Sequence, residues 1–114
     1  MITIDDVRTA AARTASYVRK TPLVPARCMR DNPFPDGDLL LKLECLQATG
    51  SFKARGATNK LLSLSEVEVQ RGIVTASGGN HGLAVAYVGW LGKTTATVFL
   101  PENVSPEKAK KLGS

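Results

Sequence analysis

A lysine at the start of a helix is the first residue whose position suggests chemistry. Lys53 lies in the segment TGSFKARGA, residues 49–57, just after Ser51, which can cap a helix. The positive end of the helix dipole and the nearby Arg55 both oppose an ammonium charge there, which favours the neutral amine that attacks an aldehyde. Taken alone, the pattern also fits a solvated helix lysine beside a core Phe52.

A glycine-rich turn is the second candidate. The segment ASGGNHG, residues 76–82, lies between an apolar run of strand length and a helical one. Its two adjacent glycines let the backbone approach a ligand, and free amides at a helix start bind a carboxylate or phosphate. Asn80 offers both a donor and an acceptor, whereas His81 fits a structural hydrogen-bonding histidine better than a catalytic base. Turns of this kind are also common structural joints.

The elements that must position these segments alternate between helix and strand. The spacing of apolar residues predicts helices at 4–19, 52–64, 66–71 and 80–91, strands at 39–44, 73–76 and 95–100, and a last helix that begins at Pro106. Residues 28–38 predict a surface loop because they are rich in turn formers. Strand, helix and strand from 73 to 100 are typical of a parallel α/β sheet. We expect a single domain, 1–114.

Together, the two segments resemble the signature segments of the fold-type II pyridoxal-phosphate enzymes, specifically the threonine/serine dehydratase and serine racemase group. The lysine segment of that group reads Ser-Phe-Lys-x-Arg-Gly-Ala, which is Ser51–Ala57 here. Residues 20–23 (KTPL), 42–44 (KLE) and 100–101 (LP) are also similar, so the resemblance covers nearly the whole chain. It implies an N-terminal helix and strand followed by part of the parallel-sheet βαβ small domain of such an enzyme. The cysteine synthase branch typically differs around its lysine.

The resemblance also implies a role for each site residue. Lys53 would bind pyridoxal 5'-phosphate covalently and later move the alpha proton of the substrate, Phe52 would lie against the pyridine ring, and Asn80 would hydrogen-bond the phenolic oxygen. The substrate carboxylate would be bound by the loop residues Ser77, Gly78, Gly79, Asn80 and His81. The implied reaction is dehydration and deamination of threonine or serine to a 2-oxo acid and ammonia.

Position 78 separates two activities of the group. In serine racemases a serine at the position of Gly78 acts as the second acid/base, and a glycine cannot do so. The sequence therefore favours elimination over a serine racemase-like activity, although the neighbouring Ser77 keeps the latter open.

The short length of the chain leaves further functional alternatives open. Enzymes of this group are longer, and their later portion carries a glycine-rich loop for the cofactor phosphate that has no counterpart here. We expect catalysis to need a C-terminal portion, which a complementary chain can supply. The alternative is a non-catalytic truncated remnant, a ligand-binding or interaction module that self-associates through open edges of its three strands. A nucleotide-phosphate loop at Gly78 and Gly79 ranks lower, because it leaves Ser51–Ala57 unexplained.

The composition of the chain argues against nucleic-acid binding, membrane insertion, secretion and metal binding. Fifteen Lys and Arg against ten Asp and Glu give a net charge of +5, but the basic residues are scattered and lack interleaved aromatics, so nucleic acid is not an expected partner. No apolar run is long enough for a membrane span, and the acidic Asp5 and Asp6 are unlike a secretory signal. Cys28, Cys45 and a single His81 do not make a zinc site, so no metal is expected. We expect a cytoplasmic homo-oligomer that acts on an amino acid.

Overall fold

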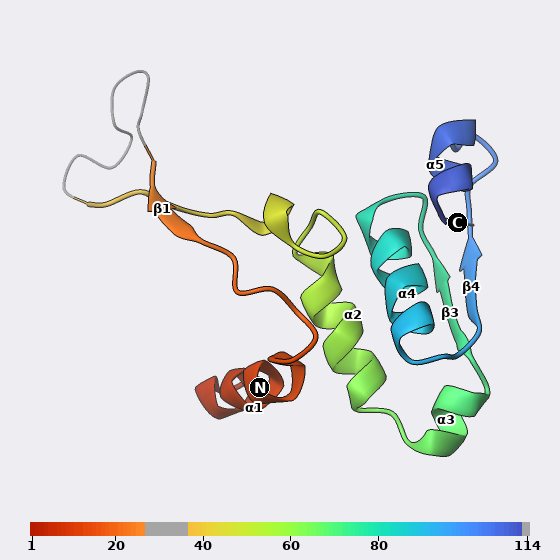
Figure 1. Ribbon diagram of the computed structural model, residues 1–114, viewed down its shortest axis with the longest axis horizontal. Coiled ribbons are helices and arrows are strands. Elements are labelled where there is room, and N and C mark those ends of the chain that lie inside the picture. The colour runs from red at the N-terminus through yellow and green to blue at the C-terminus, as the bar shows by residue number, and fades with distance from the viewer. Residues whose placement is uncertain (27–36, 113–114) are drawn as a thin grey trace.

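The computed structural model describes residues 1–26 and 37–112 (Figure 1). Most of the loop expected at 28–38 lies outside the described residues. The elements follow the order α1 (Ile4–Thr14), β1 (Leu23–Pro25), β2 (Leu40–Lys42), the 3-10 helix η1 (Glu44–Leu46), α2 (Lys53–Leu62), α3 (Glu66–Gln70), β3 (Ile73–Ala76), α4 (Asn80–Leu91), β4 (Ala96–Phe99) and α5 (Pro106–Leu112).

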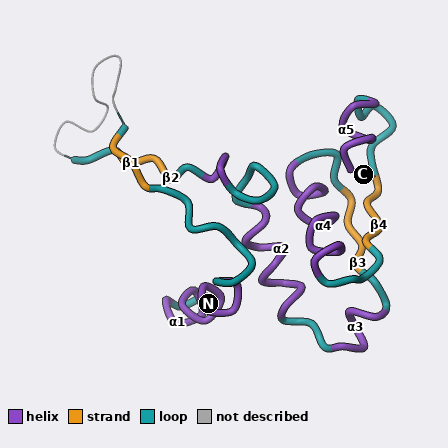
Figure 2. Tube along the Cα trace, viewed as in Figure 1, coloured by secondary structure: helices purple, strands orange, loops and turns teal. Residues whose placement is uncertain are grey.

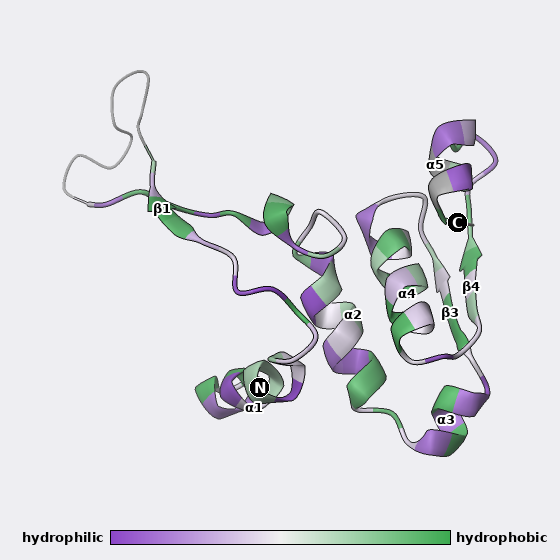
Figure 3. Ribbon diagram, in the orientation of Figure 1, coloured by the Kyte–Doolittle hydropathy of each residue, from purple (hydrophilic) through white to green (hydrophobic). Residues whose placement is uncertain are grey.

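The parallel unit expected from the sequence is confirmed. Strands β3 and β4 pair in parallel, from Ile73 opposite Ala96 to Ala76 opposite Phe99, and α4 connects them. Burial alternates along both strands, because one face of the pair meets α4 and the other is exposed. In Figure 3 apolar residues colour much of β4 and α4, whereas α3 is largely hydrophilic.

The core lies between α2 and α4, not between two sheets. Its buried members are mostly small, which lets the helices approach closely: Ala57, Leu61, Ala84 and Val88, with Val69, Ile73 and Tyr87 packed against them. Near the ends of the two helices, a Cβ on Gly92 would lie 2.8 Å from Leu61 Cδ2. The helices run in the same direction, so both begin at the end of the molecule where β3 and β4 finish (Figure 2).

Helix α1 begins as expected and ends earlier than expected. Thr3 and Asp6 form a complete capping box, in which the Thr3 amide donates to Asp6 Oδ2 at 2.7 Å. The predicted end near Arg19 is wrong, because the helix finishes at Thr14. The reason is a distant side chain: Gln47 Oε1 accepts from the Arg19 amide at 2.8 Å, and Gln47 Nε2 donates to the Arg19 carbonyl at 3.0 Å.

The first strands also differ from expectation. The predicted strand 39–44 is reduced to β2, and it pairs antiparallel with β1, which the sequence did not suggest. Among the described residues only β3 and β4 are therefore parallel, not three strands. The β1–β2 pair extends away from the helices (Figure 1), and the radius of gyration is 17.0 Å against about 13 Å for a compact domain of this length.

The remaining predictions hold with small shifts. Helix α2 begins at Lys53, one residue later than predicted, and α3 ends before Gly72, whose φ of 86° is readily adopted only by glycine. Pro106 is the first residue of α5. No helix in the part of the chain that the structure describes is long and apolar enough to cross a membrane.

Candidate functional site

Lys53 is the first residue of α2, and its side chain is exposed. The buried Ser51 lies just before it, and its Oγ accepts from the Lys53 amide at 3.4 Å. Lys53 Nζ lies 5.0 Å from the centroid of the Phe52 ring, a cation–π distance. Phe52 is 59% exposed and not a core residue. An amine and a flat apolar surface are thus presented side by side.

The turn before α4 keeps backbone donors free. Gly79 is the N-cap of α4, and no side chain caps the helix. Its own amide donates to Ser77 Oγ at 3.3 Å, while the first amide bonded within the helix is that of Leu83, to the Gly79 carbonyl. The amides of the first turn therefore face outward without an intrahelical acceptor, an arrangement that suits a carboxylate or phosphate.

The glycines of this turn differ in what surrounds them. A Cβ on Gly79 would meet nothing within 4 Å, so a ligand can approach its backbone. A Cβ on Gly78 would lie 3.2 Å from Pro101 Cδ and from Val104 Cγ2. A Cβ on Gly82 would run into the carbonyl oxygen of Ser77, so only a glycine lets the first turn of α4 lie against the loop. The sequence alone does not indicate the importance of Gly82, because it does not show which atoms lie next to this residue in the fold.

The two segments come together at one end of the fold. Lys53 and Asn80 are the first residues of α2 and α4, which pack side by side in the same direction (Figure 2). Asn80 and His81 are exposed at that end, and Ser77 and Gly78 are half-buried. His81 makes no side-chain hydrogen bond to another described residue, so the expectation of a structural histidine is not supported.

A hydrogen-bonded ion pair anchors the start of α2. Arg55 Nε donates to Glu44 Oε2 at 2.9 Å and Arg55 Nη2 to Glu44 Oε1 at 2.7 Å. Thr21 Oγ1 donates to the same Oε1 at 2.5 Å. The bonds from Arg55 lower the pKa of Glu44 from 4.5 to about 2, against an opposing effect of burial, and Thr21 contributes further.

The Glu44–Arg55 pair alters the expected effect of Arg55 on the charge of Lys53. Arg55 is not a free charge beside Lys53, because Glu44 neutralises it and in turn raises the pKa of Arg55. Its role is structural: Arg55 Nη2 also donates to the Arg19 carbonyl at 3.1 Å and so joins α2 to the linker after α1. In the sequence, Glu44 stands out only as part of the segment 42–44 that resembles the family. The sequence does contain a signal for this ion pair, because the acidic Glu44 and the basic Arg55 lie in the two segments, 42–44 and 51–57, that resemble the family.

The donor set suits an aldehyde cofactor better than a metal. Among residues 1–26 and 37–112, no group of three or more His, Cys, Asp or Glu side chains could hold a metal ion. An exposed amine, a flat ring beside it and a loop with an open face at Gly79 fit the reactive end of pyridoxal phosphate and a carboxylate next to it. The fold is of the α/β type, and the residues of this site fit a cofactor that carries a reactive aldehyde.

The chain belongs to the pyridoxal-phosphate-dependent enzyme family, whose family model matches residues 14–114. Serine racemase of Dictyostelium discoideum is 38% identical over 111 residues, 97% of this chain and 34% of that protein. Catabolic L-threonine dehydratase of Staphylococcus aureus (strain USA300) is 36% identical over 108 residues, 95% of this chain and 31% of that protein. The structure of maize serine racemase superposes with a TM-score of 0.84 at 36% identity, covering 96% of this chain and 33% of that one.

These matches confirm the family and the fold-type II architecture expected from the two motifs. Racemase and dehydratase relatives are about equally similar, so similarity alone does not separate the two activities. The chain spans about a third of the length of the curated relatives it matches.

Proposed function

We propose that this chain carries the cofactor lysine and carboxylate loop of a pyridoxal-phosphate-dependent dehydratase that converts threonine or serine to a 2-oxo acid and ammonia. The observation that carries the proposal is the shared location of Lys53 with Phe52 and the uncapped start of α4 at one end of the fold. The cofactor, when bound, supplies an electron sink for charge that develops at the substrate alpha carbon.

The residues of this chain would bind, orient and move a proton. Lys53 would hold the cofactor through Nζ and, once the substrate amine has displaced it, would accept the alpha proton of the substrate as a free amine. Phe52 would lie against the pyridine ring, and Asn80 would donate to the phenolic oxygen. The loop Ser77–His81 binds the substrate carboxylate through its free amides. Lys53, Phe52, Asn80 and His81 are exposed, and Ser77 and Gly78 are half-buried, so residues matching the other two thirds of the relatives would be needed to exclude water.

Elimination is favoured over racemisation by the surroundings of Gly78. Racemisation needs a proton donor on the face opposite the lysine, and Gly78 has no side chain to provide one. A Cβ there would already press on Pro101 and Val104, so the space beside this position is filled by apolar atoms. Ser77 is half-buried, and its Oγ accepts a hydrogen bond from the Gly79 amide. The missing side chain at position 78 supports a one-base mechanism, whereas the Ser77 hydroxyl keeps a proton to donate.

Cofactor labelling of the chain tests the proposal. Mixing with pyridoxal phosphate should produce a visible absorbance band, and borohydride reduction followed by peptide mapping should find the label on Lys53. Lys60 lies in the last turn of the same helix and is also exposed, so Lys60→Ala is the matched control for Lys53→Ala. The band should be lost in the Lys53 variant and kept in the Lys60 variant. Equal labelling of both lysines would refute the assignment.

The reaction itself is tested by complementation. The chain would be combined with the part of the Staphylococcus aureus L-threonine dehydratase that follows the matched third. Supply of L-serine should then yield pyruvate and ammonia with no D-serine, and L-threonine should yield the corresponding 2-oxo acid. D-serine as the main product would favour the racemase instead.

A non-catalytic module is the second candidate. It is supported by the outer face of β3 and β4, where Val74 and Phe99 are 69% and 61% exposed and would suit another subunit. A homo-oligomer, in which this face meets its copy, is part of the proposal under either function. We also propose a cytoplasmic location, which the exposed free Cys45 favours because reduced thiols persist there.

A further inference from the structure

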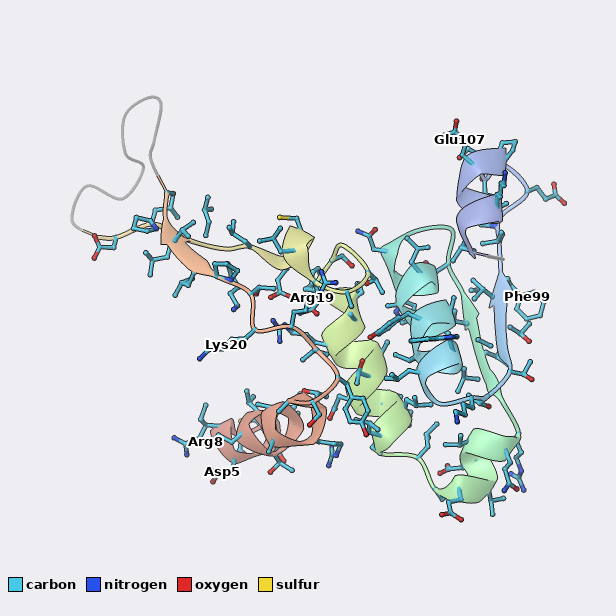
Figure 4. All side chains as sticks on the ribbon, viewed as in Figure 1. Asp5, Arg8, Arg19, Lys20, Phe99 and Glu107 are labelled. Atoms are coloured by element: carbon cyan, nitrogen blue, oxygen red, sulfur yellow. The ribbon has the colours of Figure 1, made fainter. Side chains whose placement is uncertain are left out.

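A basic cavity lies on the side of α2 that the proposed site does not use. Its volume is about 390 Å³, within the usual range for small-molecule sites, and it is bounded by α1, the linker that follows, β2 and α2. Thr14 and Val18 contribute to its wall, together with four basic residues: Arg19, Lys20, Lys42 and Arg55. Figure 4 labels Arg19 and Lys20 on the linker between α1 and β1.

Three of the four basic residues that line this cavity have no anionic partner among the described residues. Arg55 is neutralised by Glu44. Arg19 Nη1 donates to the Leu46 carbonyl at 3.1 Å and Lys42 Nζ to the Thr21 carbonyl at 2.5 Å, which are neutral acceptors. Within the described ranges the ion pairs are Arg55–Glu44 and Arg8–Asp5, so no described carboxylate lies within 4.0 Å of Arg19, Lys20 or Lys42.

The unbonded donors of these residues are available to a ligand. Lys42 uses one of its three ammonium protons, Arg19 keeps most of its guanidinium donors, and Lys20 bonds to no described residue. Like charges around one cavity repel one another, and a bound anion converts that repulsion into attraction. The lining therefore matches an anion with more than one charge better than a neutral molecule or a cation.

The cavity is separate from the Lys53 site. Two residues along a helix are rotated by about 200°, so Arg55 and Lys53 point to opposite sides of α2. Asn59, one turn after Arg55, accepts from Arg13 Nη1 at 2.7 Å, which places that face of α2 against α1. Leu61 lies near Gly92 on the α4 side. Lys53 thus lies away from α1 and from the cavity.

We propose that this cavity is a binding site for a compact multivalent anion, of the phosphate class, held by Arg19, Lys20 and Lys42. Inorganic phosphate and the phosphate group of a larger metabolite present the same chemistry. Binding would be electrostatic and directional, since charged donors bond phosphate oxygens more strongly than neutral donors do. The site does not depend on the proposed catalytic role of Lys53.

The test is a titration of the whole chain with inorganic phosphate, and with pyrophosphate, at low and constant ionic strength. Calorimetry should give saturable one-to-one binding, and amide chemical shifts should change most at Ala15 and Val18. Acetate, with a single charge, should bind at least tenfold more weakly. A phosphate monoester that binds more tightly than inorganic phosphate would identify a metabolite as the source, and equal affinity would identify the free ion.

Variants make the outcome decisive. Lys20→Gln touches no other described residue and should weaken phosphate binding at least threefold, and the double variant with Lys42→Gln at least tenfold. Arg8→Gln removes an exposed charge outside the cavity and should change the affinity less than twofold. Lys53→Ala should also leave it within twofold, whether or not Lys53 takes up pyridoxal phosphate. Absence of saturable binding, shifts centred on Gly79, or equal weakening by Arg8→Gln and Lys20→Gln would overturn the proposal.

Discussion

Arg55 and Glu44 form a side-on pair of hydrogen bonds, 2.9 Å and 2.7 Å long, that fastens the first turn of α2 to the segment before it. The contact is two residues from Lys53, so the position of the candidate cofactor lysine depends on a charge pair on the other side of its helix. The Glu44 side chain is 16% exposed and that of Arg55 36%, which places the pair between a surface and a buried salt bridge.

Breaking this pair should destabilise the fold. Glu44→Gln removes the negative charge and leaves Arg55 with neutral acceptors only, among them the Arg19 carbonyl and Thr21 Oγ1. We expect the free energy of unfolding, measured with urea, to fall by about 1–3 kcal/mol. The Arg8–Asp5 pair is the control, because its side chains are 73% and 82% exposed and Arg8→Gln should cost no more than about 0.5 kcal/mol. Equal losses in both variants would mean that Glu44 has no special role.

Stability should also depend on pH through Glu44. Its pKa is about 2 in the folded chain against 4.5 for the unperturbed group. A lowered pKa in the folded state stabilises the protein above pH 4.5, and this contribution is lost as pH falls from 4.5 towards 2. The full shift corresponds to at most about 3 kcal/mol, and solvent screening of the partly exposed Arg55 reduces it.

The measurement compares unfolding of the wild type and Glu44→Gln between pH 6 and pH 2.5. The carboxyl groups of Asp6 and Glu68 also have lowered pKa values, through bonds from Thr3 and Ser65, and they titrate in both proteins. Their effect therefore cancels in the difference. The two stabilities should converge as the pH falls, and a constant gap down to pH 2.5 would contradict the assigned pKa.

Two helix glycines should respond in opposite directions to alanine. At Gly82 the new Cβ would collide with the Ser77 carbonyl, so Gly82→Ala should destabilise the chain by about 1–3 kcal/mol and disturb the loop. At Gly56, in α2, a Cβ would meet nothing within 4 Å, and Gly56→Ala should stabilise by about 0.5–1 kcal/mol through helix propensity. Thermal unfolding would measure both. A neutral Gly82→Ala would show that the loop does not need this close approach.

The sequence predicts features that neighbouring residues determine, but not features that depend on contacts between residues far apart in the chain. Lys53 and Asn80 at helix starts, and the β3–α4–β4 unit, follow from the local spacing of apolar and turn residues, and the structure contains both elements. The cap expected from Ser51 is wrong, because the N-cap of α2 is Phe52 and no side-chain cap hydrogen bond is present at that residue. The end of α1 could not be predicted, because it depends on Gln47, 28 residues from the Arg19 backbone it binds. The three-residue strand β1 had no visible pattern, since it contains Pro25 and exists only through pairing with β2.

The outer face of β3 and β4 should drive self-association. Phe99 projects from the side of β4 away from α4 (Figure 4), and it and Val74 leave apolar surface in water beside strand edges that have no partner among the described residues. Sedimentation velocity of the wild type should show a dimer that dissociates on dilution. The double variant Val74→Thr, Phe99→Ser keeps the strands but removes apolar area, and we expect its dissociation constant to rise at least tenfold.

Ile4 on α1 is also 61% exposed, so Ile4→Ser is the matched control and should leave the dimer unchanged. A wild-type chain that stays monomeric at high concentration would count against this interface, because the exposed face would then need a different partner.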